Sequence, residues 1–164
     1  MILVTVGTEQ FPFNRLMQWI DVLQDMNAFR EEVVVQYGSC TELPKASTCH
    51  RLLPEAKFKA LVHKARIVVA HCGEGSLLTL SEAGVPFILV PRSHIFGEHV
   101  DDHQVELARA MMKLSIPVAW SPRELWQYLV RKDVQPLSLS SDILNTARLC
   151  QLLAEELSLQ ASVA

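Results

Sequence analysis

The feature that most constrains this chain is a regular alternation of short apolar segments with longer amphipathic ones. The short segments are rich in β-branched residues, are bounded by turn residues and have no polar face. Strands of that kind are buried on both sides, which requires an α/β fold with a parallel sheet covered by helices. The expected strands are residues 2–6, 33–36, 67–71 and 87–90, with a weaker one at 116–119 and a further short one near 51–53.

The segments between these strands repeat apolar residues at the spacing of an α-helix. Pro12 is placed to open the first helix, and Gly84 to close a short one. Ser121 and Glu124 have the spacing of a capping box ahead of a further helix. Together with the helix after Ser121, the helices expected from these patterns are residues 13–23, 58–65, 77–83 and 107–114.

Composition indicates one cytoplasmic domain. The 164 residues are 49% hydrophobic and 20% charged, which provides a buried core and argues against disorder. A net charge of −3 argues against a broad nucleic-acid surface, so we expect no nucleic-acid partner. No apolar run approaches the ~18 residues of a membrane span. The chain also begins directly in an apolar strand, without the basic region of a signal peptide.

The C-terminal segment, residues 139–164, contains a predicted helix over 142–159 that is apolar around much of its circumference. Such a helix packs back on its own domain or docks on another chain, and the sequence leaves both possibilities open. A homo-oligomer is also compatible with it.

The sequence predicts no metal site. The four cysteines form no CxxC pair. A Cys-His pair at 49–50 and a His-Cys pair at 71–72 would bind zinc only if the fold joined them, but adjacent residues of a strand point to opposite faces. Asp101 and Asp102 are neighbouring carboxylates at the start of a helix, so their side chains diverge.

The loop at residues 71–76 is the first candidate site, because parallel sheets bind ligands at the carboxyl ends of their strands. Gly73 and Gly75 let backbone amides approach a ligand, and Ser76 can cap the following helix and offer a hydroxyl. Phosphate is the expected ligand, and a tight structural turn is the alternative. The loop lacks the Walker lysine and the G-x-G-x-x-G spacing, which disfavours an ATPase or a dehydrogenase.

Two further loops are expected at the same edge of the sheet. The Gly-Thr turn at 7–8 follows the first strand and can present amides there. The loop at 91–104 is dense in polar side chains, and its last three residues supply both hydrogen-bond donors and acceptors, as a site for sugar hydroxyls needs. A solvated charged loop is the alternative.

These residues carry a family resemblance. The His-Cys-Gly-Glu-Gly-Ser run at 71–76, Gly-Val-Pro at 84–86 and Gly-Glu-His-Val-Asp-Asp-His-Gln at 97–104 resemble the nucleotide-sugar half of glycosyltransferase family 28 enzymes. The resemblance is to the short bacterial exopolysaccharide glycosyltransferase subunits and to the catalytic subunit of the eukaryotic dolichol-linked N-acetylglucosaminyltransferase. It covers about residues 1–115.

The resemblance implies a single Rossmann-like domain corresponding to the C-terminal, donor-binding half of a GT-B glycosyltransferase. No cofactor or divalent metal is expected, because backbone amides and the helix N-terminus offset the charge of the leaving diphosphate. The residues implied to bind substrate are Gly7, Thr8, His71, Gly73, Gly75 and Ser76 for the diphosphate, and Asp102, His103 and Gln104 for the donor sugar.

Two positions depart from the family pattern. Many relatives carry a glutamate three residues after the loop serine, where it holds the donor ribose. Here that position is Thr79, and the nearest acid, Glu82, is the candidate. Relatives also carry a small or apolar residue where this chain has Glu74. A carboxylate there is unfavourable beside a diphosphate, unless it points away or meets a cation such as Arg92.

A complete GT-B enzyme has a second Rossmann domain for the acceptor, and the single-domain relatives work with a membrane-anchored subunit that supplies it. The resemblance therefore implies such a partner, which would recruit this chain to the inner face of the membrane and would commonly supply the general base. Within this chain, Glu98 and His99 are the candidates for that base, since a histidine can deprotonate a hydroxyl near neutral pH. A role in ordering the loop is the alternative for this pair.

The leading hypothesis is the donor-binding subunit of an inverting glycosyltransferase. With its partner it would move a sugar from a UDP-sugar to a lipid-linked acceptor in exopolysaccharide or related glycan synthesis. One alternative is a non-catalytic nucleotide-sugar-binding or scaffold subunit, and another is a stand-alone nucleotide hydrolase. Glucose, galactose, glucuronate and N-acetylglucosamine all remain open as the transferred sugar.

Overall fold

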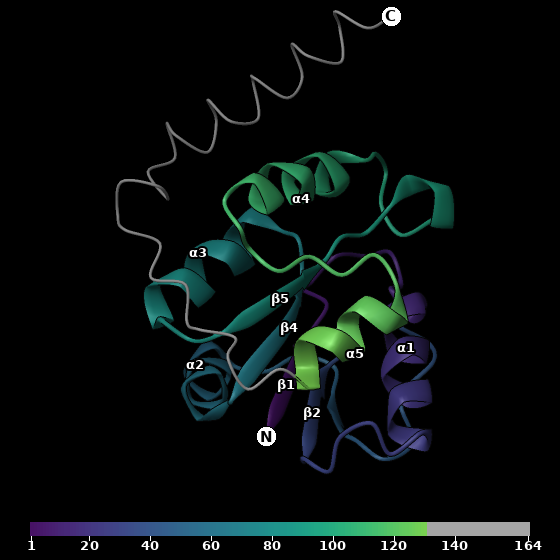
Figure 1. The fold of residues 1–164 in the computed structure, drawn as a ribbon, viewed down its shortest axis with the longest axis vertical. Coiled ribbons are helices and arrows are strands. Elements are labelled where there is room, and N and C mark those ends of the chain that lie inside the picture. The colour runs from purple at the N-terminus through teal and green to yellow at the C-terminus, as the bar shows by residue number, and fades with distance from the viewer. Residues whose placement is uncertain (131–164) are drawn as a thin grey trace, which may run out of the picture.

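The computed structural model describes residues 1–130, so the helix predicted at 142–159 lies outside the described residues. This part of the chain forms five strands and five α-helices, which alternate except that β3 follows β2 and α5 follows α4 (Figure 1). The strands are β1 (Ile2–Thr5), β2 (Val33–Gln36), β3 (Thr48–His50), β4 (Ile67–His71) and β5 (Phe87–Val90). The helices are α1 (Asn14–Asp25), α2 (Glu55–Lys64), α3 (Glu74–Ala83), α4 (His103–Lys113) and α5 (Pro122–Val130), and a short 3₁₀ turn η1 covers His94–Phe96.

The strands form one sheet in the order β3-β2-β1-β4-β5, and every pair is parallel. The predicted α/β class and parallel sheet are therefore confirmed. The chain enters at the middle strand, fills one side of the sheet with β2 and β3, and then returns to fill the other side with β4 and β5. The order reverses between β1 and β4, and ligands of such sheets bind in the crevice above that reversal.

Two apolar cores cover the two faces of the sheet, because successive strand residues point to opposite sides. On one face Leu3 and Val68 pack under α2, α3 and α4. On the other face Val4 and Val69 pack under α1 and α5. Figure 1 shows α1 and α5 on one side of the strands and α2 and α3 on the other. Within residues 1–130 no helix is long and apolar enough to cross a bilayer.

Two strand predictions differ from the structure. The strand expected near 51–53 is wrong: β3 ends at His50, and the Arg51 carbonyl instead accepts a hydrogen bond from the Gly38 amide at 2.9 Å. The weak strand expected at 116–119 is reduced to a single parallel bridge between Leu89 and Val118. Residues 116–119 lie beside the outer strand β5, and residues 51–53 follow the outer strand β3, so both segments are at the margins of the sheet.

The predicted capping box at the start of α5 is present. The Glu124 amide donates to Ser121 Oγ at 3.2 Å, and Glu124 Oε2 accepts a hydrogen bond from the Trp120 amide at 2.8 Å. These contacts satisfy amide groups that have no partner inside the helix.

Replacing Ser121 by alanine tests this cap. We expect Ser121→Ala to lower the free energy of unfolding by about 1 kcal/mol, because it leaves the Glu124 amide without its acceptor. Urea titration measures the loss. Gln127→Ala, at an exposed position of the same helix, is the control and is expected to change stability little. Equal stability of the two variants would contradict the capping role.

Candidate functional site

Three loops meet at the carboxyl edge of the sheet, above the reversal of strand order. They follow β1, β4 and β5, which are neighbours in the sheet. Of the predicted residues, Gly7 and Thr8 lie in the first loop, the 71–76 run in the second, and residues 98–104 in the third. The fold therefore gathers at one edge the segments that the sequence singled out.

His71 is the side chain around which the first two loops close. It ends β4, and its side chain is 7% exposed. A Cβ atom built on Gly7 would lie 2.5 Å from His71 Cε1, and one built on Gly73 would collide with His71 Nε2. Both glycines are therefore required for close packing against the imidazole, and Gly7 also has a φ of +75°.

Burial lowers the pKa of His71 from its ordinary value of 6.5 to about 4, and the nearby positive charge of Arg92 acts in the same direction. A hydrogen bond with the backbone of Thr5 opposes this shift in pKa. The imidazole is therefore neutral at physiological pH. A neutral imidazole holds one N–H donor and one acceptor nitrogen, so it hydrogen-bonds without adding charge.

Helix α3 begins at Glu74, three residues earlier than the predicted helix at 77–83. Gly73 is the N-cap in an extended conformation, and its carbonyl accepts the Leu77 amide at 3.0 Å. The expectation that Ser76 caps the helix is therefore wrong. Ser76 lies inside the first turn, with its Oγ 3.5 Å from His71 Nδ1.

The first turn of α3 has the properties of an anion site. Its N–H groups have no acceptor within the helix, and the positive end of the helix dipole lies there. A Cβ built on Gly75 would meet no heavy atom within 4 Å, so the space over this turn is open. Together with neutral His71, this arrangement can hold a phosphate group through hydrogen bonds.

Buried Arg92 fastens the β5 loop to the β1 loop. The guanidinium is fully buried and donates to the carbonyls of Val6 at 2.7 Å, Phe11 at 2.8 Å and Glu98 at 3.1 Å. It also lies 4.8 Å from the centre of the Phe13 ring. Arg92 is therefore an internal tie between two loops of the site. Within residues 1–130, its Nε is one of two buried side-chain polar atoms without a hydrogen-bond partner.

Glu98, a candidate base, is engaged in a buried ion pair. Arg15 donates to both carboxylate oxygens, at 2.9 and 2.8 Å, and the Ser93 amide donates at 3.1 Å. The Glu98 side chain is 3% exposed. These contacts assign Glu98 the task of positioning the β5 loop and do not favour a role in proton transfer.

His99, the other candidate base, is arranged differently. Its Nδ1 lies 2.8 Å from Asp101 Oδ1, and its side chain is 17% exposed. The Asp101 carboxylate also accepts the His103 amide, and that hydrogen bond is the main cause of its lowered pKa. If Nδ1 donates to Asp101, then Nε2 of His99 is left as an acceptor.

The three residues expected to contact the donor sugar differ in exposure and in the hydrogen bonds that they already make within the protein. Asp102 Oδ1 accepts hydrogen bonds from Ser93 Oγ and the His94 amide, both at 2.9 Å, and these bonds lower its pKa. Gln104 is buried, and its Oε1 accepts the Arg92 amide at 3.3 Å. His103 is 48% exposed and is the most accessible of the three.

The structure does not bring Glu82 to this site. Glu82 lies in the last turn of α3, eight residues and about 12 Å along the axis from Glu74. It lines a small cavity of about 140 Å³ with Lys59 and His63. Thr79, where relatives carry the ribose-binding glutamate, lies on the same cavity and donates its hydroxyl to the Gly75 carbonyl.

Glu74 does not meet Arg92, the cation suggested by the sequence, because Arg92 is buried among backbone carbonyls. Glu74 Oε1 instead lies 3.5 Å from His103 Nε2, across the gap between α3 and α4. The two Cys/His pairs considered for zinc lie on β3 and β4, which β2 and β1 separate.

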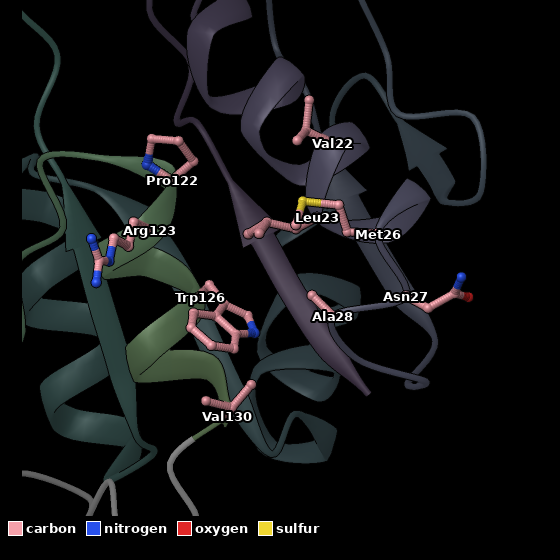
Figure 2. Close-up of a pocket in the computed structure, with 9 residues that line it drawn as sticks. All are labelled: Val22, Leu23, Met26, Asn27, Ala28, Pro122, Arg123, Trp126 and Val130. Carbon is pink, nitrogen blue, oxygen red and sulfur yellow. The ribbon is translucent and has the colours of Figure 1, made fainter.

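A second hollow lies away from this edge. It is an apolar groove of about 630 Å³ between α5 and the C-terminal half of α1. Figure 2 shows Trp126 and Val130 of α5 across the groove from Leu23, Met26 and Ala28. The groove carries no nucleophile or carboxylate among the described residues that line it, so we assign it no part in the chemistry of the site.

The fold defines the class of the protein: a Rossmann-like α/β domain corresponding to the C-terminal half of GT-B glycosyltransferases. Residues 1–148 match the model of the glycosyltransferase family 28 C-terminal domain, and the chain belongs to that family.

A curated relative and several solved structures are also similar. The UDP-N-acetylglucosamine transferase subunit ALG13 of Cryptococcus neoformans is 40% identical over 58 residues, which are 34% of this chain and 27% of the relative. MurG of Acinetobacter baumannii has a TM-score of 0.54 at 14% identity, over 94% of this chain and 49% of its own. The calicheamicin glycosyltransferase CalG4 has a TM-score of 0.52 at 20% identity, over 96% of this chain and 39% of its own. This chain thus matches less than half of each of these proteins.

The buried neutral state of His71 predicts a pH dependence of stability. Between about pH 6.5 and 4 the unfolded chain binds a proton that the folded chain does not, so the free energy of unfolding falls as pH decreases. From pH 7 to pH 5 we expect this histidine to contribute a loss of about 2 kcal/mol. His71→Gln removes that contribution, whereas His63→Gln, at an exposed position, retains it. Urea titrations of the two variants at pH 7 and pH 5 measure this loss of stability. If the free energy of unfolding of His71→Gln fell with pH as steeply as that of the wild type, the buried neutral state of His71 would be contradicted.

The Arg15–Glu98 pair predicts a large stability loss when its charge is removed. Glu98→Gln leaves the half-buried Arg15 guanidinium without its counter-charge, so we expect a loss of about 2–3 kcal/mol. The control is Glu31→Gln, which breaks the more exposed pair with Arg66 and is expected to cost below about 1 kcal/mol. Chemical denaturation compares them, and equal losses would refute the structural role of Glu98.

Proposed function

We propose that this protein is the donor-binding subunit of an inverting glycosyltransferase. In this proposal it binds a UDP-sugar at the carboxyl edge of its sheet. A membrane-anchored partner subunit binds a lipid-linked acceptor, and the sugar passes to that acceptor in exopolysaccharide or related glycan synthesis. The transferred group is a hexosyl group, and the chain works on the cytoplasmic side of the membrane.

The observation that carries this proposal is the packing of neutral His71 between Gly7 and Gly73, beside the open first turn of α3. Amides of the turn, the imidazole and the Ser76 hydroxyl supply hydrogen bonds to a diphosphate from one side. The Gly7–Thr8 turn approaches it from the other. Because these groups are fixed by packing, they need little reorganisation when negative charge develops on the leaving group.

The proposed reaction is a displacement at the anomeric carbon. An acceptor hydroxyl oxygen forms a bond to that carbon, the bond from the carbon to the diphosphate oxygen breaks with its electron pair, and UDP leaves. The hydroxyl proton passes to a general base. In this proposal no divalent metal takes part, since amides and the helix dipole stabilise the departing diphosphate.

The general base is proposed to come from the partner subunit or from His99. The Asp101 carboxylate orients the His99 ring through Nδ1, which leaves Nε2 to accept a proton. Of the sugar-binding residues, His103 is the accessible one, while Asp102 and Gln104 also hold the loop in place. In this proposal Asp102 and Gln104 hold the loop in its conformation and also contact the sugar.

The proposal of a partner is supported by the ALG13 relative, which is itself described as a transferase subunit. In this proposal a separate chain supplies the acceptor half of the enzyme.

A second candidate function is a non-catalytic nucleotide-sugar-binding or scaffold subunit. The internal contacts of Asp102 and Gln104 favour it, because they give both side chains a structural task that does not depend on a sugar. Activity of the assembled pair discriminates the two: Ser76→Ala combined with His71→Ala should abolish transfer if the reacting donor binds in this chain, and should leave transfer unchanged if the chain has no catalytic role.

Calorimetric titration of the full chain with UDP tests the donor site. We expect a dissociation constant of about 100 μM for UDP, equivalent to about 5.5 kcal/mol, and weaker binding of ADP and GDP. Gly75→Val should weaken UDP binding about tenfold or more, since the new side chain enters the space proposed for the diphosphate, where a Cβ atom would meet no heavy atom within 4 Å. Urea unfolding checks that the variant folds. Absence of UDP binding, or binding that Gly75→Val leaves unchanged, would contradict the proposal.

A further inference from the structure

The Glu74 carboxylate lies between the two parts of the proposed donor site, the first turn of α3 and the start of α4. Its backbone belongs to the first turn of α3, where the diphosphate is proposed to bind, and its Oε1 reaches to 3.5 Å from Nε2 of His103 at the start of α4. A donor that extends from the α3 turn to the sugar-binding residues of α4 passes this carboxylate. The Glu74 side chain is 55% exposed, so its carboxylate is accessible to a ligand at this position.

The charges that surround this position are mainly negative. His103 Nδ1 also lies 3.8 Å from Glu106 Oε2, so the imidazole is already placed between two carboxylates. Asp101 accepts the His103 amide at the same helix end. The cations of the edge are engaged elsewhere: Arg15 is paired with Glu98, and Arg92 is buried among backbone carbonyls.

From this arrangement we infer that Glu74 selects the donor sugar by charge: the site takes a UDP-sugar with a neutral hexose or N-acetylhexosamine and discriminates against a uronic acid. The inference rests on the proposed function and narrows its substrate class. A uronate carboxylate at the sugar position would lie beside Glu74 and compete with it for His103. A neutral sugar instead offers hydroxyls, which donate hydrogen bonds to the Glu74 carboxylate.

The size of the effect follows from the charges. Two carboxylates about 6 Å apart near a protein surface repel each other, and after screening by salt at physiological ionic strength that repulsion changes affinity about fivefold to tenfold. The diphosphate is common to all donors, so the ratio of affinities for UDP-glucose and UDP-glucuronate isolates the effect of Glu74 on the sugar.

The test is calorimetric titration of the full chain with UDP, UDP-glucose, UDP-N-acetylglucosamine and UDP-glucuronate. We expect the wild type to bind the two neutral donors at least about fivefold more tightly than UDP-glucuronate. Glu74→Gln, which keeps the side-chain shape, should bring the donors to within about twofold. Glu74→Lys should reverse the preference. The control is Glu32→Gln, an equal charge change at an exposed position before β2, at the opposite edge of the sheet, which should keep the wild-type ratio.

The outcomes separate this inference from the proposed function. If UDP and all UDP-sugars fail to bind, both are overturned. If UDP binds and the wild type holds UDP-glucuronate as tightly as UDP-glucose, the charge selection alone is overturned. Charge selection is likewise overturned if Glu74→Gln and Glu74→Lys keep the wild-type ratio while circular dichroism shows that they are folded.

Discussion

The candidate site depends on a buried guanidinium that joins two loops. Arg92 follows β5, yet two of its three carbonyl partners, Val6 and Phe11, lie in the first loop of the chain. A buried charge without partners costs several kcal/mol. The loops are therefore strongly favoured in the one geometry that supplies the guanidinium with carbonyl acceptors. Arg15 and Glu98 add a second tie between the same two parts of the chain. Together they fix the walls within which a ligand would sit.

Within those walls, the polar groups that face the proposed diphosphate carry little net charge. His71 is neutral because burial lowers its pKa to about 4, and the α3 turn contributes partial charges from its amides. Of the fully charged side chains, Arg92 is buried, and Glu74 Oε1 lies 3.5 Å from His103 Nε2, toward the residues proposed to contact the sugar. Uncharged hydrogen-bond donors held in a fixed geometry suit a nucleotide that must bind, react and leave.

The sequence was sufficient to predict the parallel sheet and the edge at which the candidate loops meet. Each strand is apolar on both faces, and the glycines, His71 and the 97–104 run follow strands whose ends meet at that edge. It did not predict the Arg15–Glu98 pair, because those residues are 83 positions apart and no local pattern connects them. It also misassigned the partner of Glu74 and the cap of α3, which depend on side-chain burial and on backbone angles at Gly73. An arginine two residues after a buried strand was the available signal for the contacts between the two loops.

The measurement that tests the central claim most directly is an amide chemical-shift map of the isotope-labelled chain during titration with UDP. We predict that the largest shifts fall on the amides of Gly7, Gly73, Glu74, Gly75 and Ser76. Shifts that instead cluster around the α1–α5 groove, or no shifts up to millimolar UDP, would contradict a donor site at the carboxyl edge of the sheet.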